Sequence, residues 1–216
     1  MAQPDLVNVT DDKVKVTIIN PTITTETTTF NIPKIVPGTY SEDNYGRYVD
    51  NVKAFDHNGK SLKIAKIDEN SYTIFEATKL AKVTYYVSDT FDTEGGAGFG
   101  ESEDIFSPAG TNIKAGENFM LNTHGFVGYF QDQKDLPYQV TITHPETLWG
   151  ATSMIDSDAS ATKDVFNTPR YAELVENPIM YAKPDYTSFN VNGMDIQIVV
   201  YSPSGKVLTF GSSYSK

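Results

Sequence analysis

Turn-forming residues interrupt this 216-residue chain at short intervals, and the segments between them alternate apolar and polar side chains. Residues 13–19 (KVKVTII) and 138–143 (YQVTIT) show this period of two, which puts every second side chain on one face of a β-strand. Thr, Val, Ile, Tyr and Phe are abundant, whereas helix-forming stretches are scarce. The pattern predicts an all-β fold, an antiparallel β-sandwich.

A proline corner at residues 33–37 (PKIVP) is the sharpest break in this pattern. Pro33 and Pro37 lack the backbone N–H that a sheet ladder needs, so the strand before them must end. The dipeptide Pro37-Gly38 predicts a tight turn whose glycine takes positive φ. We therefore expect the corner to project Tyr40 away from the sheet.

The rest of the pattern predicts a meander of short strands. Residues 13–19 and 23–32 should pair with each other across Asn20-Pro21. Residues 118–130 are the most apolar stretch and should form one buried strand, with a kink or bulge at Gly125 and Gly128. Further strands are expected at residues 47–55, 61–67, 71–75, 79–87 and 138–143, with hairpin turns at residues 56–59 and around Asn192-Gly193.

A single short helix is predicted near residues 169–176. Thr168 is a suitable N-cap and Pro169 fits the first helical position. The following Asn177-Pro178 should end the helix after about two turns.

The composition excludes several classes of function. A net charge of −11 without a basic cluster argues against a nucleic-acid partner. No apolar run is long enough for a membrane span. The absence of cysteine excludes disulfides and thiolate chemistry. We expect one β-sandwich domain over residues 1–203 and a linker over residues 204–216.

Two features of the sequence each have two possible interpretations. The glycine-rich acidic segment 89–104 could bind calcium through its carboxylates, or it could be a solvated surface loop without a regular calcium-binding spacing. Trp149, the only tryptophan, could close the core or stack on a ligand.

Catalytic motifs are absent from the sequence. The histidines His57, His124 and His144 are scattered, and no H-E-x-x-H or G-x-S-x-G motif occurs. Glu173 and Glu176 share a helix face at i, i+3, which is also the spacing of an ordinary solvated face. The sequence thus predicts no catalytic residue, no metal ligand and no cofactor in this chain.

Five segments in order resemble the N-terminal domain of the glycyl aminopeptidase family of zinc metallopeptidases. That family carries a P-x-x-x-PG-S/T-Y pattern, a V-x-N-V-x-A segment and a Y-x-E-L-x-D/E-x-P element. The resemblance extends from about residue 30 to residue 201. The segments are IPKIVPGTY (32–40), GRYVDNVKAFDHNGKSL (46–62), KVTYYV (82–87), LPYQVTITHPETLWGATSM (136–154) and YAELVENPI (171–179).

The resemblance implies a non-catalytic β-rich domain that precedes a thermolysin-like catalytic domain, often with a PDZ domain after it. Zinc and its H-E-x-x-H ligands would belong to that catalytic domain of the same polypeptide, beyond the linker. The domain would pack on it and help shape access for peptide N-termini. Such proteins are usually secreted, so we expect a periplasmic or cell-envelope location in a bacterium, with the signal peptide removed.

The resemblance also suggests site residues. By analogy with the wider aminopeptidase superfamily, Asn122 and His124 are candidates for a substrate-binding cleft edge, since an amide or neutral imidazole can accept a hydrogen bond from an ammonium group. The alternative is that both only satisfy backbone groups. Tyr40 is a third candidate at that edge, with core packing as its alternative. The candidates for interdomain contact are Glu173, Glu176 and Asn177.

Two rival functions stay open at this point. One is a stand-alone binding module for carbohydrate or cell-surface adhesion that uses the Tyr and Phe side chains for stacking. The other is a hydrolase in its own right, which would depend on Glu173 or His124.

Overall fold

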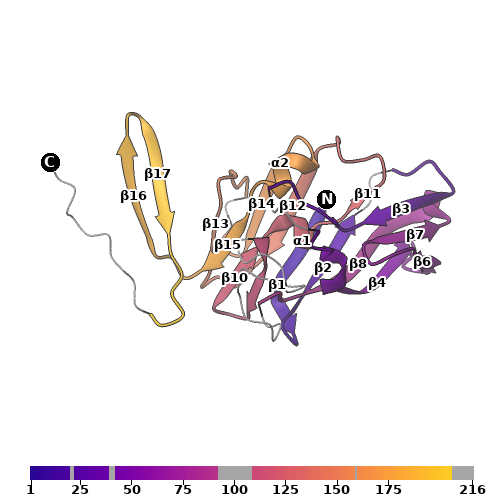
Figure 1. The fold of residues 1–216 in the computed structure, drawn as a ribbon, viewed down its shortest axis with the longest axis horizontal. Coiled ribbons are helices and arrows are strands. Elements are labelled where there is room, and N and C mark those ends of the chain that lie inside the picture. The colour runs from indigo at the N-terminus through magenta and orange to yellow at the C-terminus, as the bar shows by residue number, and fades with distance from the viewer. Residues whose placement is uncertain (20–21, 39–41, 92–108, 159, 206–216) are drawn as a thin grey trace.

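The computed structural model describes residues 1–19, 22–38, 42–91, 109–158 and 160–205, and it confirms the all-β sandwich (Figure 1). The strands up to the acidic segment are β1 (Ala2–Thr10), β2 (Lys13–Ile19), β3 (Thr27–Asn31), β4 (Val49–Asp56), β5 (Ser61–Leu62), β6 (Ile64–Lys66), β7 (Ser71–Phe75) and β8 (Leu80–Ser88). After it come β9 (Asn112–Lys114), β10 (Asn118–Leu121), β11 (Tyr129–Phe130), β12 (Tyr138–Thr143), β13 (Trp149–Ala151), β14 (Lys163–Thr168), β15 (Ile179–Ala182), β16 (Tyr186–Val191) and β17 (Met194–Val199).

Helical structure is limited to short pieces. The α-helices are α1 (Thr123–Phe126) and α2 (Tyr171–Val175), and the 3-10 turns are η1 (Tyr45–Tyr48) and η2 (Ala77–Lys79). In the described part of the chain, no helix has the length and hydrophobicity needed to cross a membrane.

Three sheets form the body of the sandwich. The largest has the strand order β14-β12-β1-β2-β8-β4-β5, and in it β1 and β12 run parallel. The two four-stranded sheets have the orders β13-β15-β10-β9 and β11-β3-β7-β6. A separate two-stranded sheet, β16-β17, projects from the body as a hairpin (Figure 1).

Alternating side chains of the large sheet form one wall of the core. On β2, Val14, Val16 and Ile18 are buried while their neighbours face outward. Phe30 of β3 packs against Tyr85 of β8, with ring centroids 5.6 Å apart. The large sheet and the smaller sheets thus share one hydrophobic core.

The expected pairing of residues 13–19 with residues 23–32 is wrong. The strand β2 pairs with β1 and β8 of the large sheet, whereas β3 pairs with β7 and β11 of a small sheet. Residues 61–67 are likewise divided, because β5 pairs with β4 and β6 pairs with β7. In both places the chain crosses between layers, which alternation alone does not reveal.

The prediction of a single buried strand over residues 118–130 is also wrong. The chain forms β10, then one helical turn at α1, and then β11. The amide of Val127 donates to the carbonyl oxygen of Thr123 at 2.8 Å, which is a helical hydrogen bond. All four residues of α1 are buried, so the stretch lies in the core without being one continuous strand.

Two further predictions need correction. The helix α2 begins at Tyr171 rather than at Pro169, because Thr168 still belongs to β14 and its hydroxyl donates to the carbonyl oxygen of Arg170 at 3.2 Å. Trp149 does not lie in the core: it is 36% exposed and packs its ring on Tyr186, 5.3 Å away.

The turn predictions are confirmed. The proline corner follows the end of β3, and Gly38 has φ of 98°. Gly59 closes the β4–β5 turn with φ of 78°. Asn192 and Gly193 both have positive φ, as a type I′ hairpin turn requires.

Candidate functional site

The two short helices lie against each other and bring the predicted site residues together. The hydroxyl of Thr123 in α1 donates to the carbonyl oxygen of Leu174 in α2 at 2.7 Å, inside the structure. As a result, the residues around Asn122 lie next to the segment 173–177, although 51 positions separate Thr123 from Leu174 in the sequence.

Asn122 and His124 are both buried, at 6% and 4% exposure. The Asn122 side-chain amide donates to the carbonyl oxygen of Gly110 at 2.5 Å. Nε2 of His124 donates to the carbonyl oxygen of Ala109 at 3.1 Å. Both side chains thus form hydrogen bonds with backbone carbonyl oxygens, as the alternative interpretation of the sequence proposed. Substrate binding by them stays a prediction.

The environment of His124 favours a neutral ring. Burial lowers its pKa, although the backbone groups of Ala109 and Val175 act in the opposite direction. Nδ1 is buried and makes no hydrogen bond of good geometry among the described residues. The Tyr45 ring packs on the imidazole in a T-shaped contact at 4.6 Å.

A groove of about 490 Å³ separates the proline corner from α2. Its apolar surface includes Ile35, which is 57% exposed, and the packed rings of Tyr129 and Tyr171, 5.0 Å apart. The ammonium group of Lys134 lies 4.1 Å from the centre of the Tyr129 ring. The rim carries charges of both signs, from Lys34, Lys134, Asp135, Arg170 and Glu176.

Of the predicted interdomain residues, Glu176 lines this groove, whereas Glu173 and Asn177 lie next to its lining residues in the chain. The Nε of Arg170 donates to both carboxylate oxygens of Glu173 at 2.8 Å. The side chain of Asn177 closes the end of α2, because its amide donates to the carbonyl oxygen of Glu173 and its oxygen accepts from Ser153. Glu176 is exposed and faces the groove. Contact of these residues with another domain stays a prediction.

Several predictions fall wholly or partly outside the described residues. Tyr40 and the break at Asn20-Pro21 lie outside them. The linker predicted over residues 204–216 is described only to residue 205, and the acidic segment only at residues 89–91. There the Asp89 carboxylate accepts from the backbone amides of Phe91 and Ile113, so it holds the segment against β9. Among the described residues, no group of three or more His, Asp or Glu side chains is placed to hold a metal ion.

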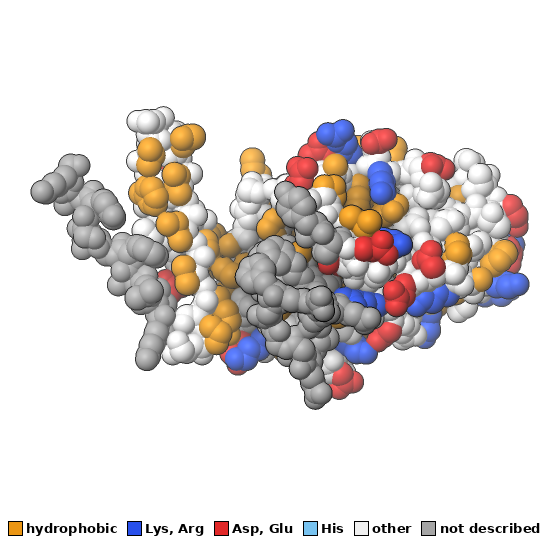
Figure 2. Space-filling model, in the orientation of Figure 1, with side chains coloured by type: hydrophobic (Ala, Val, Ile, Leu, Met, Phe, Trp, Pro, Cys, Tyr) orange, Lys and Arg blue, Asp and Glu red, His pale blue; other side chains and the backbone are white. Residues whose placement is uncertain are grey.

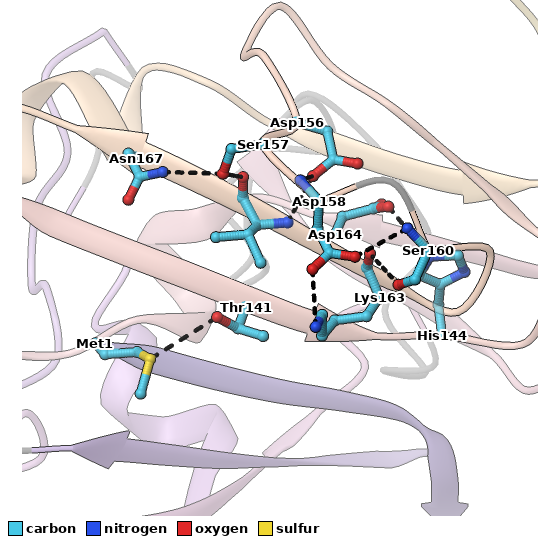
Figure 3. A network of polar contacts seen from close by, with 11 residues as sticks. Met1, Thr141, His144, Asp156, Ser157, Asp158, Ser160, Lys163, Asp164 and Asn167 are labelled. Atoms are coloured by element: carbon cyan, nitrogen blue, oxygen red, sulfur yellow. Dashed lines mark hydrogen bonds and ion pairs between the residues drawn. The ribbon is translucent and has the colours of Figure 1, made fainter.

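A second polar cluster, which no sequence motif predicts, joins the large sheet to β15; its members His144 and Asp164 are labelled in Figure 3. Nε2 of His144 lies 3.3 Å from Asp164 of β14, and the Tyr181 hydroxyl of β15 donates to the other carboxylate oxygen. A Cβ at Gly150 would lie 2.6 Å from that same oxygen, so the site requires glycine there. Twenty positions separate His144 from Asp164, and no local motif links them.

The protonation of His144 follows from its partners. Burial alone would lower the pKa of His144, but hydrogen bonds to Asp164 and to the Pro145 carbonyl oxygen outweigh it and raise the pKa. Both acceptors favour the imidazolium, which donates from both ring nitrogens. We interpret this cluster as a set of hydrogen bonds that holds the large sheet to the sheet that contains β15.

The comparisons with known proteins agree with this fold. A family model described as the peptidase M61 N-terminal domain matches residues 3–183. Curated proteins show no significant match. Among solved structures, the chain is similar to an aminopeptidase N family protein from Idiomarina loihiensis, at a TM-score of 0.72 and 17% sequence identity. The likeness covers 91% of this chain and 31% of that protein, so the chain spans less than a third of its length.

Proposed function

Because the chain belongs to the family of peptidase M61 N-terminal domains, we propose that it is the non-catalytic β-rich domain of a secreted metallo-aminopeptidase. It packs on a zinc catalytic domain of the same polypeptide and narrows access so that peptide N-termini enter. The proposed parent is of the glycyl aminopeptidase type, carries a PDZ domain and is located in the periplasm or cell envelope.

The family match over residues 3–183 carries this proposal. It covers nearly the whole sandwich and is specific for a domain that stands at the N-terminus of a peptidase. The similar protein from Idiomarina loihiensis is about three times as long as the matched region, which leaves room for a catalytic domain in a polypeptide of that kind. The zinc ligands and the general base then lie in that domain.

The groove between the proline corner and α2 is the proposed docking surface. It combines exposed apolar side chains with a rim of mixed charge, as interfaces between domains of one chain do. Glu176 lines it, Glu173 pairs with the lining residue Arg170, and Asn177 is the next residue after Glu176. The helix α1, next to Asn122, contacts α2 through the hydrogen bond from Thr123 to Leu174. Docking there would bring α1 and the 109–110 segment towards the catalytic domain.

The proposal is tested first on the reading frame and its product. We expect an H-E-x-x-H motif with a distal Glu downstream of Lys216, and zinc-dependent release of N-terminal residues from peptides by the longer polypeptide. A peptide with an acetylated N-terminus should not be cleaved, and the 216-residue chain alone should show no turnover. Turnover by the isolated chain, or a frame without such a motif, contradicts the proposal.

The docking surface has a matched pair of probes. Ile35 in the groove is 57% exposed, and Ile67 in the β6–β7 turn is 58% exposed. Ile35→Asp in the longer polypeptide should lower peptidase activity or uncouple the unfolding of the two domains, while Ile67→Asp should do neither. Equal behaviour of the two variants would place the interdomain contact elsewhere.

A further inference from the structure

The hairpin β16–β17 is the largest unexplained feature of the molecule. It begins at Tyr186, just beyond the last residue of the family match, and it stands apart from the sandwich (Figure 1). Hydrophobic side chains lie along it on the surface (Figure 2). A lone two-stranded hairpin is at best marginally stable in water, so this one needs a partner surface.

The strand register sorts the hairpin into two unlike faces. One face carries Tyr186 opposite Val199 at the base of the hairpin, and then the polar pairs Ser188 opposite Gln197 and Asn190 opposite Asp195. The Asn190 amide donates to the Asp195 carboxylate at 2.9 Å. The other face is almost wholly apolar. It carries Phe189 opposite Ile196, Val191 opposite Met194 and Thr187 opposite Ile198. This is the alternation of a strand pair that buries one side.

The sandwich body does not cover the apolar face. Met194 is 62% exposed and Phe189 is 45% exposed. Trp149 of the body contacts the base of the hairpin through Tyr186, which lies on the polar face with Ser188 and Asn190. This contact between described residues therefore lies on the face opposite Phe189 and Met194.

We propose that the hairpin is the first structural unit of the domain that follows in the same polypeptide, and that its apolar face packs into that domain's core. The proposal rests on the proposed function only in requiring such a domain. It places the domain boundary at residues 183–185, between β15 and β16, rather than at residue 203.

Two observations favour this occupant over a second copy of the chain. The family match ends at residue 183, so the hairpin is not part of what defines the N-terminal domain. A domain that follows in the same polypeptide also meets the hairpin at a high effective concentration, whereas a second copy must associate from solution. The apolar face should then be covered in every molecule, independent of concentration.

Amide hydrogen exchange tests the proposal on the 216-residue chain and on the longer polypeptide. In the 216-residue chain, amides of residues 187–198 should exchange within about tenfold of unstructured peptide. In the longer polypeptide their protection should rise by about 100-fold or more. Phe189→Asp should abolish that gain, whereas Ser188→Asp, on the polar face of the same strand, should preserve it.

Each outcome has a defined meaning. Hairpin amides that exchange equally fast in both polypeptides overturn the inference, even if the longer one is an active peptidase. Absence of peptidase activity contradicts the proposed function, while a gain in protection that depends on Phe189 still supports the inference. If sedimentation of the 216-residue chain shows a dimer that Phe189→Asp dissociates, the occupant is a second copy and the inference is overturned. The wild-type comparison decides the matter should Phe189→Asp fail to fold.

Discussion

The sandwich body and the hairpin β16–β17 both alternate apolar and polar side chains, but the apolar side chains are buried in the body and exposed on the hairpin. On β2, Val14 and Val16 are 0% exposed because the smaller sheets cover them. On the hairpin, Val191 and Ile198 repeat the same alternation and are 39% and 38% exposed. Alternation therefore specifies which side chains share a face, and the covering layer decides whether that face is buried.

The strongest test of this difference makes one substitution in each region. Phe30→Ala should lower the free energy of unfolding of the 216-residue chain by about 3–5 kcal/mol, because it leaves a cavity beside Tyr85 and Phe130. Phe189→Ala should change it by less than about 0.5 kcal/mol. Urea unfolding measures both, and equal losses would mean that the hairpin packs on the body.

The next largest effect concerns two glycines in the stretch 123–130. A Cβ at Gly128 would collide with the Phe30 ring and lie 2.8 Å from the Asn31 carbonyl oxygen, so Gly128→Ala should cost about 1–3 kcal/mol. A Cβ at Gly125 would lie 3.4 Å from the Thr111 methyl, an ordinary contact. Gly125→Ala should thus stay within about 1 kcal/mol of wild type. A neutral Gly128→Ala would show that β3 and β11 can separate at no cost.

How much of the fold the sequence predicts depends on how local each signal is. The positive φ of Gly38, Gly59 and Gly193 and the bounds of β2, β7 and β12 follow from a few neighbouring residues, and these predictions are confirmed. The crossing from β5 to β6 is set by partners elsewhere in the chain, and the alternation simply continues through it. The strand β1 contains Pro4, which argues against an interior strand, although β1 lies between β12 and β2.

The roles of the candidate site residues stay predictions, and the structure adds only their proximity. Asn122 and His124 lie close to the segment 173–177 because the Thr123 hydroxyl donates to the Leu174 carbonyl oxygen. Their depth was not predictable, because it depends on the 109–110 segment that covers them. The pairing of His144, which follows β12, with Asp164 of β14 could not be predicted, because no local sequence pattern links residues 20 positions apart.

A third prediction uses the pH dependence of this pair. The pKa of His144 is raised in the folded state, whereas an unfolded histidine titrates near about 6.5. The contact should therefore contribute fully below about pH 6.5 and lose its contribution as the pH rises through the folded pKa. His144→Gln should cost roughly 1–3 kcal/mol at about pH 5 and less at higher pH.

Urea unfolding across this pH range checks the prediction. His57→Gln, in the exposed β4–β5 turn, is the matched control and should leave the curve parallel to wild type. A loss at His144 that does not depend on pH would mean that the ring contributes by packing on Tyr181, 5.0 Å away, and not by its charge.

The smallest effect expected in the 216-residue chain concerns Glu173. Its pair with Arg170 is largely exposed, so Glu173→Gln should change the free energy of unfolding by less than about 0.5 kcal/mol, and by still less in high salt. Glu76→Gln, which removes the equally spaced pair with Lys79 in η2, should behave the same way. In the longer polypeptide the two variants should diverge, since a carboxylate enclosed at a domain contact is worth more than a solvated one. If they stay alike there, α2 faces solvent in the whole protein and the interdomain contact does not include Glu173.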